Sequence, residues 1–192
     1  MFKESSEKYL EELKKGMDGI DLEKLNRIVE ILKEAYENDK QVFIFGNGGS
    51  CATASHFAED LNKGCLIENK KRFRVISLTD NIPLMTALAN DEGYEFIFSK
   101  QLESLMEEGD VVIGISGSGN SKNVLNGIKF GNEKGITIGL GGFDGGELKN
   151  ICKECLIVPL NHMGKVEDLH LVIAHMIIYY FVGDEDNKID NK

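Results

Sequence analysis

Residues 42–64, which read VFIFGNGGSCATASHFAEDLNKG, decide the fold of this chain. The first four residues are apolar and rich in β-formers, which predicts a short buried strand. The glycine-rich turn 46–50 follows, and the pattern then becomes helical, with Gly64 as the predicted end of the helix. A helix that begins directly after such a turn presents N–H groups and the positive end of its dipole. We therefore expect the turn to bind an anion such as a phosphate group.

Two better-known phosphate-binding loops do not fit this turn. The dinucleotide fingerprint G-x-G-x-x-G, counted from Gly46, would need a glycine where Cys51 stands. The P-loop would need Gly-Lys followed by Ser or Thr, and no such triplet follows. We therefore expect no nucleotide cofactor. A simpler alternative is that the glycines serve only the close packing of strand and helix.

Two titratable residues, His56 and Asp60, stand four positions apart in the predicted helix and so share one of its faces. An imidazole beside a carboxylate suits proton transfer or metal binding. The segment therefore combines an anion site with groups that can carry out chemistry.

The composition excludes several classes of function. The chain has 192 residues, with 22 Lys and Arg against 32 Asp and Glu and a formal net charge of −10, so we expect no nucleic-acid partner. No apolar run has the length of a membrane span and no signal peptide opens the sequence, which indicates a cytoplasmic protein without a membrane partner. Its four cysteines are then expected to be reduced. Cys152 and Cys155 form one C-x-x-C pair, half a zinc site at best, and are better explained as small buried residues at the start of a strand.

Five short apolar runs alternate with helical segments, which predicts a parallel sheet with helices on both faces. The expected fold class is α/β, a three-layer α/β/α sandwich preceded by N-terminal helices. Residues 1–182 are expected to form one domain, in which residues 1–39 are a helical arm, and the charged tail 183–192 is expected to be disordered. The predicted strands are 42–45, 73–78, 110–115, 136–140 and 155–160.

Most of the remaining segments are predicted helices. The arm breaks between residues 16 and 21 and carries two apolar stripes, which must be buried on its own sheet or on another subunit. The last helix is apolar over most of its surface, which predicts burial, and His170 within it is expected to be a hydrogen-bonded core residue. A polar stretch at 68–72 is expected to be hairpin-like. Besides the arm, the predicted helices are 50–64, 84–89, 94–108, 121–134, 145–152 and 166–182.

A second turn, residues 116–121 with the sequence SGSGNS, opens the helix after the third strand. Hydroxyl and backbone N–H groups at a helix start can surround a phosphate monoester without lysine or arginine. The simpler alternative is that Ser121 is only the N-cap of the helix. Three serines exceed what a cap needs, so we favour a phosphate site. Because both turns follow strands of a parallel sheet, we expect both at its carboxyl edge, where such folds bind ligands.

Five segments, taken in order, carry a resemblance to a known family: FGNGGS (45–50), HFAEDL (56–61), NDEGYEFIFS (90–99), GISGSGNS (114–121) and EDLHLVIAH (167–175). Together they closely resemble the SIS (sugar isomerase) domain family. The resemblance is to the branch that acts on phosphoheptoses, and it extends from the N-terminal helices to His175. It implies a five-stranded, flavodoxin-like α/β/α fold, a homotetramer with active sites at subunit interfaces, and a sugar phosphate as ligand. The implied reaction converts the ketose sedoheptulose 7-phosphate into the aldose D-glycero-D-manno-heptose 7-phosphate through an enediol.

The resemblance also implies the site residues. Asp60 and His175 are implied as the acid–base pair. Some relatives hold a zinc ion, one per subunit, and the residues that match its ligands are His56, Asp60, Glu167 and His175. The residues implied in substrate binding are Asn47, Gly48, Gly49, Ser50, Asn90, Asp91, Ser116, Gly117, Ser118, Ser121 and Glu167.

Three positions depart from the family pattern. Asp60 is one methylene shorter than the usual glutamate, Glu167 replaces a glutamine, and Gly117 replaces a threonine. Glu167 and His175 also stand about 12 Å apart along their helix, too far to share a metal by spacing alone. The departures at Asp60 and Glu167 leave open the isomerisation of a different ketose phosphate. The resemblance leaves a second alternative, a non-catalytic regulatory protein that binds a sugar phosphate, because some members of the family are binding proteins. A regulator need not keep Asp60 and His175, so their presence favours catalysis.

Overall fold

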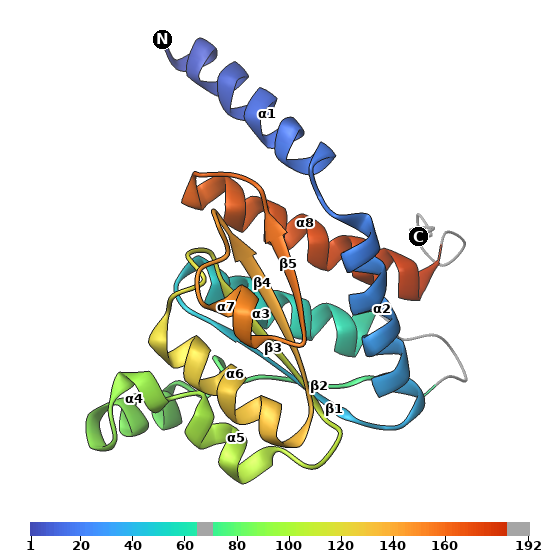
Figure 1. Ribbon diagram of the computed structural model, residues 1–192, viewed down its shortest axis with the longest axis vertical. Helices are drawn as coiled ribbons and strands as arrows, with labels where there is room; N and C mark the ends of the chain where they lie inside the picture. Colours follow the sequence, from blue (N-terminus) through green and yellow to red (C-terminus); the bar gives the residue numbers. More distant parts are fainter. Residues whose placement is uncertain (65–70, 184–192) are drawn as a thin grey trace, which may run out of the picture.

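The computed structural model describes residues 1–64 and 71–183, and it shows a parallel sheet between two layers of helices (Figure 1). The strands lie in the order β2-β1-β3-β4-β5, which is the flavodoxin-like order. The predicted α/β/α fold class is therefore confirmed. The strands are β1 (Gln41–Gly46), β2 (Arg74–Ser77), β3 (Val111–Ser116), β4 (Ile136–Gly142) and β5 (Glu154–Val158).

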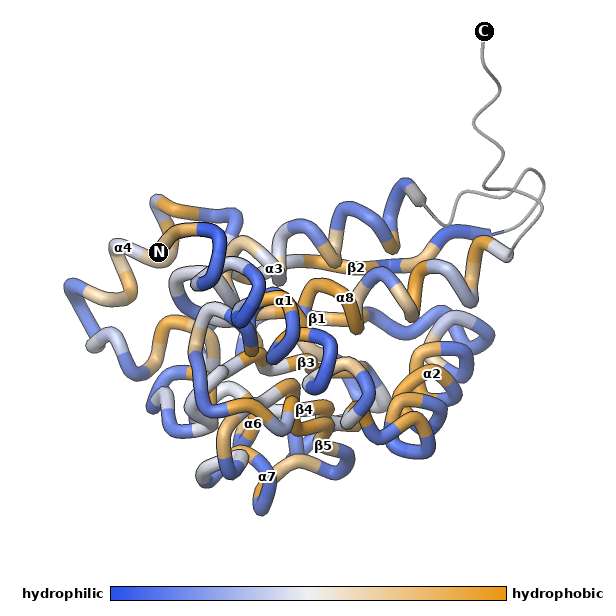
Figure 2. The backbone as a smooth tube through the Cα atoms, turned by 90° about the horizontal axis from the view of Figure 1, so that it is seen from above, coloured by the Kyte–Doolittle hydropathy of each residue, from blue (hydrophilic) through white to orange (hydrophobic). Residues whose placement is uncertain are grey.

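Each face of the sheet is covered by its own set of helices. A separate hydrophobic core lies between the sheet and the helices on each face. Figure 2 shows the hydrophobic residues gathered in the strands and in α8, while α1 is mostly hydrophilic. One layer contains α2 (Leu22–Glu37), α3 (Gly49–Glu59) and α8 (Met163–Val182). The other contains α4 (Ile82–Asp91), α5 (Ser99–Leu105), α6 (Lys122–Lys134) and α7 (Leu148–Ile151).

The two helices of the N-terminal arm behave differently. α2 buries its apolar stripe against the chain's own sheet, whereas α1 (Phe2–Asp18) projects from the body of the protein (Figure 1). Near its C-terminal half α1 contacts α8, where Glu12 pairs with the buried Lys165. Further out, Phe2 and Leu10 are 89% and 64% exposed. One stripe of the arm is therefore covered within the chain, and the other is covered only in part.

The predicted helix at 94–108 is wrong in its extent. The structure has a 3₁₀ turn, Tyr94–Phe96, followed by the short helix α5. One cause is the side chain of Asn126, which donates to the carbonyl oxygen of Glu95 at 2.9 Å. In a continuous helix that carbonyl would accept the N–H four residues later. The hydrogen bond from Asn126, which lies on α6, thus takes the place of a backbone hydrogen bond of a regular helix.

The predicted burial of α8 holds for one side of the helix only, because Met176, Tyr179 and Tyr180 are exposed. The buried side includes His170, whose Nε2 lies 2.9 Å from the carbonyl oxygen of Gly141, so its predicted place in the core is confirmed. Most of the predicted hairpin-like stretch at 68–72, and the predicted tail beyond residue 183, lie outside the described residues.

Candidate active site

The glycine turn joins the carboxyl end of β1 to the N-terminus of α3. Gly48 has a φ of +55° and a ψ of −120°, a backbone conformation that favours glycine. At Gly46 an added Cβ would lie 2.7 Å from the Cβ of Ser50 and 2.8 Å from the carbonyl oxygen of Ile115. The glycines therefore set both the path of the turn and its close approach to β3.

The serine turn leads in the same way from β3 into α6. The Ser116 hydroxyl donates to the Ser121 hydroxyl at 3.2 Å, and the Ser118 hydroxyl accepts from the backbone N–H of Asn120 at 3.2 Å. Ser121 occupies the N-cap of α6, but its side chain accepts no hydrogen bond from the first helical turn. Capping alone therefore does not explain why a serine stands there.

The two turns enclose one cavity of about 230 Å³ at the carboxyl edge of the sheet. Its polar lining brings together nine of the eleven residues predicted to bind substrate. Ile115 and Met163 complete the wall. The predicted residues in the lining are Asn47, Gly48, Gly49, Ser50, Ser116, Gly117, Ser118, Ser121 and Glu167.

The other two predicted binding residues, Asn90 and Asp91, do not line this cavity. They end α4, which runs two residues beyond the predicted helix end at residue 89, and they are exposed. The Asn90 amide donates to the Asp91 carboxylate at 2.7 Å. Within one chain these two residues therefore lie apart from the serine and glycine turns.

A larger hollow, of about 580 Å³, lies beside the edge strand β2. It is lined by Ser55, Ser77 and Asp80, among others, and the Ser55 hydroxyl is hydrogen-bonded to the Asp80 carboxylate. The smaller cavity is the candidate for the predicted anion site, and we call it the anion cavity, because in it two glycine-rich turns meet the N-termini of helices longer than two turns.

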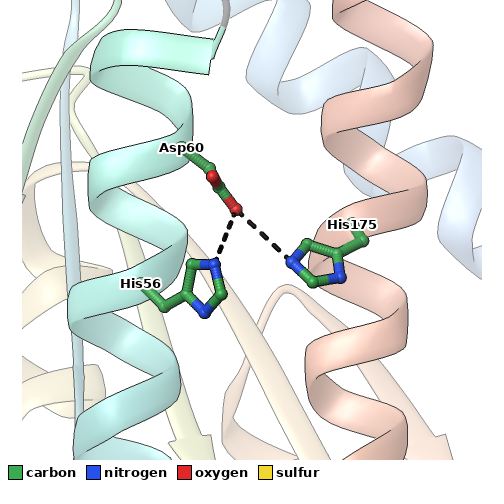
Figure 3. A group of neighbouring side chains, drawn as sticks. All are labelled: His56, Asp60 and His175. Atoms are coloured by element: carbon green, nitrogen blue, oxygen red, sulfur yellow. Dashed lines mark ion pairs between the residues drawn. The ribbon is translucent and has the colours of Figure 1, made fainter. Parts of the chain in front are cut away.

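His56, Asp60 and His175 form a compact group between α3 and α8 (Figure 3). Both Nε2 atoms face the same carboxylate oxygen, Oδ2 of Asp60, at 3.4 Å from His56 and 3.6 Å from His175. Ligand atoms about 2.0–2.1 Å from a tetrahedral zinc ion lie roughly 3.4 Å apart. The spacing of these three side chains therefore suits a metal ion.

Glu167 is not part of this group of three, although the sequence predicted it as a fourth ligand. It lies two turns earlier on α8, against the glycine turn, where a Cβ added to Gly49 would be 2.5 Å from a Glu167 carboxylate oxygen. The structure thus places Glu167 in the anion cavity and the other three predicted ligands beyond it.

Burial raises the pKa of Asp60 above its ordinary value. The positive charge that His56 and His175 carry when protonated acts in the opposite direction, and the neighbouring Glu59 adds to the rise. A carboxylate with a raised pKa is a stronger base than an ordinary aspartate.

The two parts of the site are joined by helices that pack together. Gly49 and His56 are seven residues apart on α3, about 10 Å of helical rise, and α3 packs against α8. A phosphate in the cavity and a reactive carbon beside Asp60 would thus be separated by about the length of a short sugar chain.

Two residues that sequence reasoning missed contact this site. Tyr94 and Asn123 both hydrogen-bond to the side chain of Asn47. Asn123 stands two residues after the serine turn and Tyr94 stands within a motif that carried the resemblance, but nothing in the sequence pairs either with Asn47.

Comparisons with known proteins agree with this geometry. The SIS domain family model matches residues 3–142. A probable phosphoheptose isomerase of Thermoplasma acidophilum is 40% identical over 173 residues, covering 90% of this chain and 94% of the relative. The phosphoheptose isomerase of Clostridium acetobutylicum is 42% identical over 161 residues, covering 83% and 82%. The chain therefore belongs to the SIS domain family, within its group of phosphoheptose isomerases.

A solved structure supports the same assignment. The phosphoheptose isomerase of Neisseria gonorrhoeae superposes with a TM-score of 0.87 at 29% identity, covering 94% of this chain and 98% of that one.

Among residues 1–64 and 71–183, no helix has the length and apolar character needed to cross a membrane.

Proposed function

We propose that this protein is an aldose–ketose isomerase that interconverts sedoheptulose 7-phosphate and D-glycero-D-manno-heptose 7-phosphate through an enediol. The observation that carries the proposal is the group of His56, Asp60 and His175, which stands on the same two helices that border the anion cavity. The names of the relatives, which match over most of the chain, support the seven-carbon substrate.

The serine turn and the glycine turn bind the phosphate group in this proposal. Ser116, Ser118 and Ser121 supply hydroxyl groups, and the N-termini of α3 and α6 supply backbone N–H groups and favourable dipoles. Among residues 1–64 and 71–183, those that line this cavity include no lysine or arginine. Binding therefore relies on neutral donors and helix dipoles.

Asp60 and His175 carry the proton in this proposal. Isomerisation removes a proton from the carbon beside the ketose carbonyl and returns one to the former carbonyl carbon. The raised pKa of Asp60 suits it as the base, and His175 is the acid–base partner at the other end of the enediol. Asp60 begins a π-helical turn, Asp60–Gly64, a distortion found often at functional sites.

A zinc ion, one per subunit, would be held by His56, Asp60 and His175. Glu167, the proposed fourth ligand, lies in the anion cavity of its own chain and would reach the ion only by leaning towards it or from another subunit. The donor set of imidazole and carboxylate fits zinc, although it fits other divalent metals as well. When bound, the ion would polarise the carbonyl oxygen of the sugar.

The proposed enzyme acts in the cytoplasm as a homotetramer of single domains, residues 1–182, with shared active sites. The uncovered apolar side chains of α1 and the exposed side of α8 support an assembly. Asn90 and Asp91, which lie apart from the cavity of their own chain, could reach the site of a neighbouring subunit. Light scattering checks this assignment, and a monodisperse monomer at micromolar concentration would contradict it.

The proposed reaction is tested by NMR with sedoheptulose 7-phosphate in D₂O, comparing the wild type with Asp60→Asn, His175→Asn and Glu167→Gln. We expect exchange of the substrate proton to be lost in the first two variants and retained in the third. If Asp60→Asn exchanges at the wild-type rate, Asp60 is not the base. A panel of ketose phosphates with five to seven carbons distinguishes a different substrate, and binding without exchange for every sugar would identify a regulatory protein.

A further inference from the structure

Asn47, in the glycine turn, is held by residues from two other parts of the chain. Its Oδ1 accepts from the Tyr94 hydroxyl at 2.8 Å and from Nδ2 of Asn123 at 2.8 Å. Its Nδ2 donates to Oδ1 of Asn123 at 2.9 Å. The two amides thus form a reciprocal pair, and the tyrosine adds a third bond to the same Asn47 oxygen.

The direction of these bonds is fixed by the backbone. The N–H of Val124 donates to Oδ1 of Asn123 at 2.9 Å. A backbone N–H can only donate, so turning the Asn123 amide around would set its NH₂ group against this N–H. Asn123 is 2% exposed, so such a mismatch would set two buried donors against each other. The orientation of Asn123 in turn fixes the orientation of Asn47.

This arrangement leaves Asn47 with one specific group to offer a ligand. Its oxygen already accepts two bonds, and one of its two N–H groups is used by Asn123. The second N–H has no partner among residues 1–64 and 71–183, and Asn47 lines the anion cavity. The side chain is therefore prepared as a hydrogen-bond donor.

We propose that Tyr94 and Asn123 are positioning residues that hold Asn47 as a donor to an oxygen of the bound sugar phosphate. The inference rests on the proposed function, because it concerns the ligand of the same cavity. Asn47 can then recognise a phosphate oxygen or the lone pair of a sugar oxygen. Tyr94 also ties the segment that follows α4 to the glycine turn, since it begins the 3₁₀ turn Tyr94–Phe96.

A double-mutant cycle tests whether Tyr94 acts through Asn47. The variants are Tyr94→Phe, Asn47→Ala and their combination. The matched control is Tyr36→Phe, which also loses a single hydroxyl bond, here the 2.8 Å bond to the carbonyl oxygen of Lys71. Binding is measured by calorimetry with glucitol 6-phosphate, a sugar-alcohol phosphate without a carbonyl to isomerise. KM and kcat are measured with sedoheptulose 7-phosphate, and melting temperatures verify folding.

We expect Tyr94→Phe to weaken binding and raise KM about three- to tenfold, the effect of one lost hydrogen bond, with a smaller change in kcat. In the Asn47→Ala background the same substitution should change binding less than about twofold, because the two residues act as one unit. Tyr36→Phe should leave binding unchanged.

Equal losses from Tyr94→Phe in both backgrounds, or no loss in the wild-type background, would overturn the inference while the isomerase function stands. A wild type that neither binds glucitol 6-phosphate nor isomerises a ketose phosphate would refute the proposed function, and this inference with it.

Discussion

The buried His170 gives the protein a pH-dependent stability that can be worked out from its contacts. Its Nε2 faces the carbonyl oxygen of Gly141 at 2.9 Å, and a carbonyl can only accept, so Nε2 carries the proton of the neutral ring. Its Nδ1 is buried without a hydrogen-bond partner among the described residues. Protonating that nitrogen would place a charge in an apolar interior, and burial accordingly lowers the pKa of His170 from 6.5 to about 4.

The sign of the effect follows from this pKa. An unfolded chain gains the proton near pH 6.5, whereas the folded chain resists protonation until about pH 4. The contribution of His170 to stability is therefore complete above pH 6.5 and is lost as the pH falls from 6.5 towards 4. The loss amounts to about 2 kcal/mol at pH 5 and about 3 kcal/mol at pH 4.

The assay is urea unfolding at pH 8 and pH 5, followed by circular dichroism, for the wild type and His170→Gln. Glutamine can donate its amide N–H to Gly141 but does not titrate. Both proteins are held at one concentration with a chelator, so that assembly and metal release contribute equally. We expect the variant to lose about 2 kcal/mol less than the wild type between the two pH values. An equal loss in both would refute the reasoning.

Three further predictions concern the site. Ser118→Ala should weaken binding of a sugar phosphate by about 1–2 kcal/mol in calorimetry and barely change the melting temperature, whereas the reverse pattern would indicate a structural role. Glu167→Gln should tighten binding of inorganic phosphate by about 1 kcal/mol in the same assay, because it removes a like charge from the cavity. Elemental analysis without chelator should find about one metal ion per chain in the wild type and a clear deficit in His175→Asn, and a metal-free wild type would contradict the metal site.

The fold could be predicted because its two decisive turns are local features. A strand, a glycine or serine turn and a helix start follow one another within a few residues at 42–50 and at 111–122. The apolar run predicts the strand, and the change to helical periodicity after the turn predicts the helix. The errors arose where tertiary contacts overrule the local pattern. The region 94–108 has helical periodicity, yet Asn126 takes the Glu95 carbonyl and interrupts the helix.

The candidate site was predictable in its members but not in its arrangement. The resemblance named His56, Asp60 and His175, and the structure adds that both imidazoles face one carboxylate oxygen. Tyr94 and Asn123 were missed because the hydrogen bonds that join them to Asn47 span 47 and 76 residues of sequence. No local spacing rule reports a contact over such distances.

Two departures from the family pattern, at residues 117 and 167, change the character of the anion cavity together. A Cβ added to Gly117 would lie 2.4 Å from the sulfur of Met163, so this thioether occupies the space in which a threonine side chain would begin. The cavity thereby exchanges a hydroxyl donor for an apolar wall. Glu167 adds a carboxylate beside Gly49 in the same small space.

A phosphate that enters this cavity meets the negative charge of Glu167. Two like charges about 4 Å apart repel each other by about 1 kcal/mol in bulk water and by more at the lower dielectric constant of a protein surface, and the described residues that line the cavity include no lysine or arginine to offset them. Phosphate binding therefore favours a Glu167 side chain that has turned away from Gly49 or is paired with a cation.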